Sequence, residues 1–303
     1  MTPVIIEAAV NGITSKARNP CVPQTPEEIA ADLTRCVAAG AAIVHNHIDV
    51  LTTDADVAAA RYLEGWRPLL RERPDALVYP TVGFGATVAE RYAHIPLLAG
   101  SGLMRMSLFD PGSVNLGAVG DDGVPGGAFD FVYLNSFTDL RYVAGLCEQY
   151  RLAPSIAIFE PGFLRATLAY ARAGRLPAGA FVKLYFGGDH DYMSGTAGGV
   201  SFGLPPTPTA LAAYLELLAG SDLPWAVAVV GGDVVESGLA RLALEKGGHL
   251  RVGLEDHAGR RTPTNEELVR EAVTLARQVG RPVATCDEAA RVLGIAYNAK
   301  RET

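Results

Sequence analysis

Eight short apolar runs of strand length alternate along the chain with longer stretches of helical period, and this alternation constrains the fold more than any other feature. Glycine, proline and aspartate mark the joins, as expected for repeated βα units with a parallel sheet. Strict alternation of eight strands with eight helices predicts an α/β protein with a closed (β/α)8 barrel, the TIM barrel, and not an open doubly wound sheet. The predicted strands are 3–10, 41–48, 76–82, 103–109, 155–160, 180–186, 225–231 and 249–255.

The helical stretches carry their own start and stop signals. Segments 25–40 and 207–220 begin with Thr-Pro, a pair favoured at the N-cap and the first helical position, and both end in glycine. Segment 262–280 is expected to form the last barrel helix, and 286–294 a short C-terminal helix. Because no linker or low-complexity tract divides the 303 residues, we expect a single domain over 1–303.

Charge and composition exclude several classes of partner. The formal net charge is -7 and Lys and Arg form no cluster of five or more, so nucleic acid and anionic membranes are not expected partners. No apolar stretch approaches the roughly 20 residues of a spanning helix, and the N-terminus does not resemble a signal peptide. The four cysteines are far apart and form no C-x-x-C pair, which predicts reduced thiols without a structural zinc site. We therefore expect a cytoplasmic protein.

Strand parity predicts which polar side chains face the barrel interior. One face of each barrel strand packs beneath helices and should be apolar, while the other faces inward. In 180–186, Val182, Leu184 and Phe186 share the outer face, which leaves Lys183 and Tyr185 pointing inward. Applied to the first and last strands, the same rule predicts the inward residues Glu7, His249, Arg251, Gly253 and Glu255.

The spacing of His45 and His47 projects two imidazoles in one direction from the second strand, and Glu255 at the end of the eighth can complete a facial set of metal ligands. Two nitrogens and an oxygen suit zinc, although nickel, manganese or iron would also accept them. Two histidines can instead stabilise a polar barrel mouth by hydrogen bonds. The metal interpretation gains weight because all three residues fall at C-terminal strand ends, where barrel active sites are built.

Asp256 follows the third predicted ligand where the strand becomes loop, so it can turn toward the metal as a general base. Inward Arg251 is positioned to orient Asp256 by ion pairing. The alternative for Arg251 is a structural charge pair in the barrel floor.

Several segments resemble the β-keto acid cleavage enzymes, and the resemblance covers nearly the whole chain. They are HNH at 45–47, GGHLRVGLEDH at 247–257, IIEAAVNGIT at 5–14, WAVAVVGG at 225–232 and GRPVATCDEAARVL at 280–293. The resemblance implies a zinc-dependent barrel that exchanges the acyl unit of a β-keto acid with acetyl-CoA, giving acetoacetate and a new CoA thioester. It implies that His45, His47 and Glu255 bind zinc, and that Arg251 and Asp256 are two of three residues that activate the substrate. It also implies a homo-oligomer, either a dimer or a tetramer.

The sequence departs from the best-known members of that family at positions that would touch the substrate. The third activating residue, a glutamate there, corresponds to Ala157. Glu7 and Lys183 replace uncharged residues, so we hypothesise that Glu7 supports Arg251 or pairs with Lys183; a buried pair that only fills the barrel is the alternative. Thr14 replaces a glutamate that receives a substrate ammonium group, which predicts a substrate without an amino group at that point.

Three further residues are expected to bind substrate because of the resemblance. Thr81, Gly83 and Ser107 fall where the family binds the substrate carboxylate and keto group through hydroxyls and backbone N–H groups. The segment VGFGAT keeps only part of the family turn, and an ordinary βα turn is the alternative.

Two other functions remain open. Metal-dependent amide or lactone hydrolases also carry H-x-H on a barrel, but on the first strand and with histidines on strands five and six; 155–160 has none. A non-catalytic scaffold gives no reason for the inward charges at Glu7, Lys183 and Arg251. We therefore expect a zinc enzyme that acts on a small β-keto acid with acetyl-CoA as co-substrate.

Overall fold

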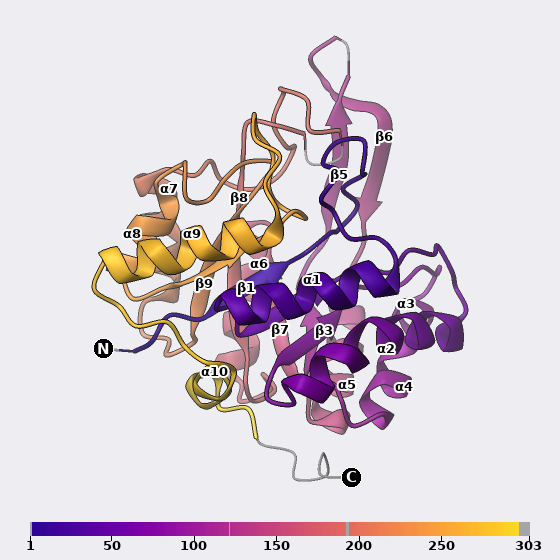
Figure 1. Ribbon diagram of the computed structural model, residues 1–303. Helices are drawn as coiled ribbons and strands as arrows, with labels where there is room; N and C mark the ends of the chain where they lie inside the picture. The colour runs from indigo at the N-terminus through magenta and orange to yellow at the C-terminus, as the bar shows by residue number, and fades with distance from the viewer. Residues whose placement is uncertain (1, 121, 192–193, 297–303) are drawn as a thin grey trace.

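The computed structural model describes residues 2–120, 122–191 and 194–296. Eight parallel strands form a nearly closed barrel with helices on the outside (Figure 1). Their order around the barrel is β3-β2-β1-β10-β9-β8-β7-β4. The strands are β1 (Ile6–Ala9), β2 (Ile43–Asn46), β3 (Leu77–Pro80), β4 (Met106–Phe109), β7 (Ala153–Ile158), β8 (Phe181–Gly187), β9 (Trp225–Val230) and β10 (His249–Val252). All eight predicted strands are present and the predicted TIM-barrel class is confirmed, although most strands are shorter than predicted.

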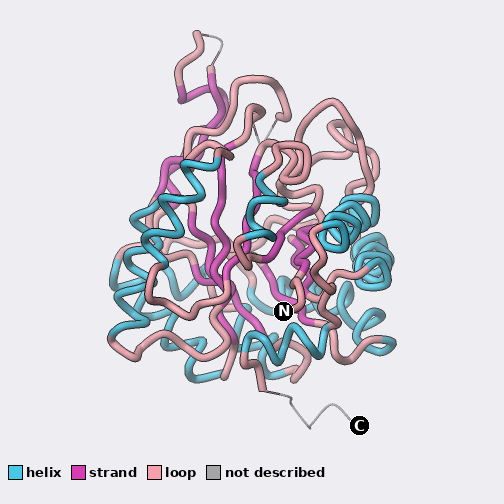
Figure 2. The backbone as a smooth tube through the Cα atoms, turned by 90° about the vertical axis from the view of Figure 1, so that its left-hand side faces the viewer, coloured by secondary structure: helices cyan, strands magenta, loops and turns pink. Residues whose placement is uncertain are grey.

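The helices surround the strands, as Figure 2 shows. Thr25 and Thr207 are N-caps whose side chains accept backbone hydrogen bonds, and proline follows each, as predicted. The predicted C-terminal helix is also present. The helices are α1 (Pro26–Ala39), α2 (Ala55–Glu72), α3 (Val88–Arg91), α4 (His94–Gly100), α5 (Phe137–Tyr150), α6 (Pro161–Arg172), α7 (Pro208–Leu218), α8 (Leu239–Glu245), α9 (Asn265–Gln278) and α10 (Cys286–Leu293). None of the helices in the described part of the chain combines the length and hydropathy that a membrane span requires.

An antiparallel hairpin interrupts the strict alternation that the sequence predicts. It comprises β5 (Val114–Val119) and β6 (Pro125–Tyr133), lies between β4 and α5, and projects beyond the barrel (Figure 1). Frequent glycines between 117 and 127 dilute its apolar alternation, so periodicity did not predict it. Its second strand returns the chain to the barrel and brings Tyr133 into contact with Asp110.

The interior of the barrel is polar at one level, as parity predicts. Val182, Leu184 and Phe186 are fully buried, and Phe186 packs against Tyr214 of α7 on the outer face. Lys183 points inward instead, to Glu7 of β1. Glu7 pairs in register with Arg251 on the neighbouring strand, and Lys183 reaches the same carboxylate from β8.

Candidate active site

Three side chains from β2 and the segment after β10 converge at the C-terminal rim of the barrel. Nε2 of His45 lies 3.3 Å from Oε2 of Glu255, and Nε2 of His47 lies 3.5 Å from Oε1. One potential ligand atom from each residue lies within 4.8 Å of the others. Oε2 of Glu255 is buried yet has no hydrogen-bond partner among the described residues. Two converging imidazoles and a carboxylate with an unsatisfied oxygen fit a divalent cation such as zinc.

Two asparagines fix the backbone that carries these ligands. Asn11 accepts a hydrogen bond from the His47 N–H at 2.8 Å and donates to the His47 carbonyl at 3.1 Å. Asn265 accepts from the Leu254 N–H at 2.8 Å and donates to the Val10 carbonyl at 2.7 Å. Each asparagine therefore ties a ligand-bearing segment to the end of β1, a role that sequence reasoning did not foresee.

Tyr79 and Gly12 also help to position the side chains of His45 and Glu255. Nδ1 of His45 lies 3.2 Å from the Tyr79 carbonyl oxygen, and the two rings stack with centroids 4.4 Å apart. A hydrogen bond at Nδ1 leaves Nε2 free to bind a metal. Gly12 has φ +54°, and a Cβ there would lie 2.4 Å from Cγ of Glu255. Only glycine permits this close approach without strain.

A buried ionic cluster lies beneath the ligands. Arg251 donates to Asp256 through Nε at 2.7 Å and Nη2 at 3.1 Å, and to Glu7 through Nη1 at 2.9 Å. Nζ of Lys183 lies 3.4 Å from the same oxygen of Glu7 and donates to the Tyr79 hydroxyl at 2.7 Å. Tyr79 in turn donates to Glu7 at 2.5 Å. Both contacts hypothesised for Glu7 are therefore present, and Arg251 joins Glu7 to Asp256.

The charges of the barrel mouth have a net negative balance. Four carboxylates face two cationic side chains, so the fully ionised cluster has a net charge of two negative units, which a divalent cation would neutralise. The six residues are Glu7, Asp110, Glu255, Asp256, Lys183 and Arg251. Burial lowers the pKa of His45 to about 3, which keeps the imidazole in the neutral form that ligates metals.

Burial and neighbouring charges also shift the supporting groups. Burial raises the pKa of Glu7, but Lys183 and Arg251 outweigh it, so the pKa lies below the usual value and Glu7 is ionised. Burial lowers the pKa of Lys183, an effect that Glu7 opposes. Burial raises the pKa of Asp256, and Arg251 opposes that shift.

Several polar groups that were expected to bind substrate already form hydrogen bonds within the protein. The Thr14 hydroxyl is buried and donates to the Leu254 carbonyl at 2.7 Å. The backbone N–H of Thr81 donates to the Tyr62 hydroxyl, and that of Gly83 to the Arg91 carbonyl. Both N–H groups therefore already donate hydrogen bonds within the protein. At this turn, the Thr81 side chain is the group that could contact a substrate.

Ser107 and Asp110 differ in the side of β4 that they occupy. The Ser107 hydroxyl lies beside the Cys147 thiol of α5, which places it on the outer face of the strand. Phe109 also packs outward, against Tyr170 of α6. Asp110 faces inward, where Lys183 influences its charge. The geometry therefore gives the Ser107 side chain no route to the mouth, and β4 contributes Asp110, which sequence reasoning did not assign to the site.

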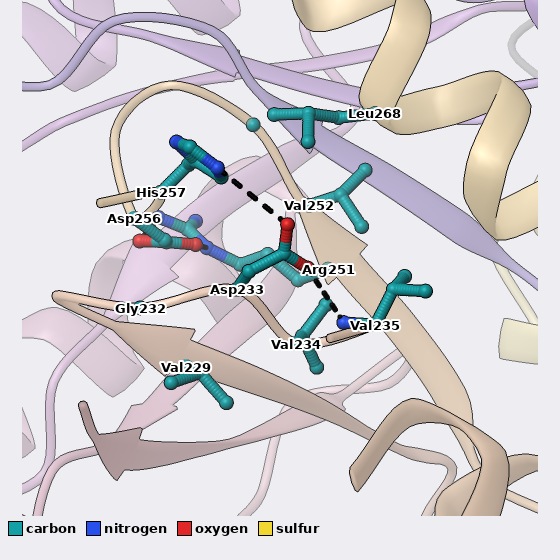
Figure 3. Close-up of a pocket in the computed structure, with 11 residues that line it drawn as sticks. Val229, Gly232, Asp233, Val234, Val235, Arg251, Val252, Asp256, His257 and Leu268 are labelled. Carbon is teal, nitrogen blue, oxygen red and sulfur yellow. Dashed lines mark hydrogen bonds and ion pairs between the residues drawn. The ribbon is translucent and has the colours of Figure 1, made fainter. Parts of the chain in front are cut away.

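One cavity reaches this cluster, and a second lies along the loop that follows β10. Figure 3 shows the smaller, of about 10 Å³, whose lining includes Arg251, Asp256, His257 and Val229; Asp256 is drawn against Arg251. Its volume suits about one water molecule, so it is too small for a substrate. The larger, of about 230 Å³, lies between the loops after β1, β8 and β10. Polar and basic residues line it, including Thr14, Arg18, Ser194 and Arg261.

Comparison with known proteins agrees with this arrangement. The model of the β-keto acid cleavage enzyme family matches residues 3–295. The chain belongs to this family. It is 28% identical to the 3-keto-5-aminohexanoate cleavage enzyme of Fusobacterium nucleatum, over 97% of this chain and 99% of the relative. It is also 28% identical to the 3-oxoadipate:acetyl-CoA acetyltransferase of Cupriavidus necator, over 97% and 95% of the two chains.

The fold is shared with a solved structure. The apo structure of ObcA superposes with a TM-score of 0.66 at 18% identity, covering 93% of this chain and 67% of that one. This likeness supports the barrel architecture. The family match and the two relatives identify the chain as a β-keto acid cleavage enzyme of the transferase type.

Proposed function

We propose that the protein uses zinc, held by His45, His47 and Glu255, to exchange the acyl unit of a β-keto acid with acetyl-CoA. The products are acetoacetate and a new acyl-CoA. The observation that carries the proposal is the bidentate Arg251–Asp256 pair, which fixes a carboxylate directly beside the three-residue ligand set. A general base must be held in this way to act on a bound substrate.

Each group has a defined task in this reaction. Bound zinc would polarise the keto oxygen of the substrate and so acidify the adjacent carbon. Asp256 accepts the proton from the carbon between the keto and carboxylate groups, and that carbon attacks the acetyl thioester. CoA leaves as a thiolate and attacks the original keto carbon, and the bond between the keto carbon and the central carbon breaks. Asp256 returns the proton to the carbon of the departing acetoacetate, so atoms and charge balance.

Glu7 and Lys183 act through Arg251 in this account. Glu7 neutralises Arg251 on the side away from Asp256, and Ala157 stands where the family resemblance implies a glutamate. Glu7 is fully buried and does not need to touch the substrate. Both residues are therefore positioning residues, and Thr81 remains a proposed substrate contact through its hydroxyl.

We also propose a homo-oligomer located in the cytoplasm. Apolar side chains on the hairpin and the start of α5 are exposed, among them Val132 at 58%, Leu134 at 56% and Phe137 at 78%. Neighbouring exposed apolar side chains of this kind mark interaction surfaces. Light scattering of the purified protein measures the oligomeric state, and a monomer would contradict the proposal.

The direct test is turnover of the zinc-loaded protein with acetyl-CoA and a panel of β-keto acids, followed by mass spectrometry of the CoA thioesters. We expect a new acyl-CoA in equal amount to acetoacetate. Replacing Asp256→Asn should lower kcat by about 100-fold or more, while the exposed hairpin variant Asp130→Asn should match wild type. Hydrolysis of an amide or lactone, without any new acyl-CoA, would favour the hydrolase alternative instead.

A further inference from the structure

Asp110 brings an acidic side chain to the barrel mouth that the reaction above does not use. Phe109 pairs with Ile156 of β7, so the next residue, Asp110, lies beside Ala157. The Ala157 side chain at this position is a single methyl group. In the strand order β4 lies four strands from β10 in either direction, so Asp110 faces Arg251 and Glu255 across the mouth.

The Asp110 carboxylate lacks a cationic partner among the described residues. Tyr133 donates to Oδ2 at 2.5 Å, and Oδ1 accepts no hydrogen bond from the residues that the structure describes. The nearest cations, Lys183 and Arg251, are bonded to Glu7 and Asp256. Burial raises the pKa of Asp110, an effect that a paired cation would reverse.

Aromatic rings lie beside this carboxylate. Phe159, two residues after Ala157 on the same face, packs against Tyr133, Tyr185 and Phe202 with ring centroids 6.2, 5.0 and 5.2 Å apart. Ring faces attract ammonium and quaternary ammonium groups, and a neighbouring carboxylate adds direct charge attraction. The wall formed by Asp110, Tyr133 and Phe159 therefore has the composition of a receptor for an organic cation.

We propose that Asp110, Tyr133 and Phe159 bind a cationic nitrogen at the far end of the acyl chain of the β-keto acid. This inference rests on the proposed function, which places the carboxylate and keto groups near the zinc ligands and Arg251. A chain extending from there across the mouth reaches Asp110. Thr14 cannot serve as this receptor, because it carries no charge and its hydroxyl is bonded to Leu254.

The test compares β-keto acids of equal chain length that end in an ammonium, a trimethylammonium, a tert-butyl or a carboxylate group. With wild-type protein we expect kcat/KM for a cationic substrate to exceed that for the tert-butyl isostere by about 30-fold or more, as for loss of a buried charge partner. Asp110→Asn should lower kcat/KM for the cationic substrates by about the same factor, mainly through KM, and so remove this preference. Asp130→Asn on the exposed part of the hairpin is the matched control.

Binding separates a recognition role from a structural one. Calorimetry should show that trimethylammonium-bearing substrate analogues bind the zinc-loaded protein at least tenfold more weakly after Asp110→Asn, with an unchanged melting temperature. Turnover of neutral or anionic substrates in preference to cationic ones would overturn this inference and leave the proposed function intact. Failure of every β-keto acid to give an acyl-CoA would overturn the proposed function itself.

Discussion

Replacement of Glu7 by glutamine tests the ionic cluster because it removes one charge and almost no volume. Glu7 is fully buried and lies 2.9 Å from Arg251 and 3.4 Å from Lys183. The variant leaves two buried cations facing a neutral amide. Breaking a buried pair in this way costs about 3 to 5 kcal/mol. For a chain of this size, each kcal/mol lowers the melting temperature by about 2 °C, so we expect a fall of roughly 6 to 10 °C.

Activity should fall as well, because Arg251 loses the anchor opposite Asp256. A displacement of the base by about 1 Å can lower kcat by about 100-fold, and we expect kcat in Glu7→Gln to fall by about 10- to 100-fold. KM should change less, since Glu7 does not contact the substrate in this account. Steady-state kinetics and urea denaturation on the same protein preparation measure both effects.

The double variant Glu7→Gln/Lys183→Met supplies the control. Removing Lys183 restores the charge balance that Glu7→Gln disturbs, so the double variant should be more stable than the sum of the single changes by about 1 to 3 kcal/mol. Strictly additive losses would contradict the ionic coupling. A Glu7→Gln protein within 1 kcal/mol of wild type, with normal kcat, would refute the reasoning altogether.

Gly12→Ala should weaken zinc binding by about tenfold or more in a chelator competition assay, because the new Cβ would collide with Glu255. Gly174→Ala is the control: Gly174 has φ +63°, so alanine there carries the same backbone strain, but no atom lies within 4 Å of its Cβ. This control variant should bind zinc normally. His249 is buried near the opposite end of the barrel, and burial lowers its pKa to about 3. Below about pH 6.5 the unfolded chain therefore binds a proton at this histidine that the folded chain does not, so the free energy of unfolding falls as the pH drops toward 3. In denaturant titrations over this range, His249→Asn should reduce the slope of the free energy of unfolding against pH by about 1.4 kcal/mol per pH unit. Dialysis against a chelator should abolish turnover and lower the melting temperature, and added zinc should restore both; full activity after dialysis would count against a metal enzyme.

Local patterns predicted much of the barrel and its candidate metal site. The length of a strand, the alternation of apolar and polar residues along it and the turn residues at its ends are all local features of the sequence. The eight strands and the inward positions of Glu7, Lys183 and Arg251 could therefore be predicted. The grouping of His45 and His47 with Glu255 also followed, because the C-terminal ends of barrel strands share one rim.

The features that escaped prediction depend on contacts between distant segments. Tyr79, Asn11 and Asn265 support the site through partners far away in sequence, which no local pattern indicates. Asp110 lies at the mouth because it directly follows β4 and faces inward, whereas the resemblance favoured Ser107. Parity applied to β4 would have favoured Asp110, since Ser107 shares the outer face with Phe109.

In the proposed reaction, acetyl-CoA supplies two carbons of the acetoacetate formed. The measurement is turnover with acetyl-CoA labelled with 13C in both acetyl carbons and an unlabelled β-keto acid, followed by NMR of the products. We expect label at C3 and C4 of acetoacetate and none in the new acyl-CoA. Labelled acetate, or label in the new acyl-CoA, would contradict it.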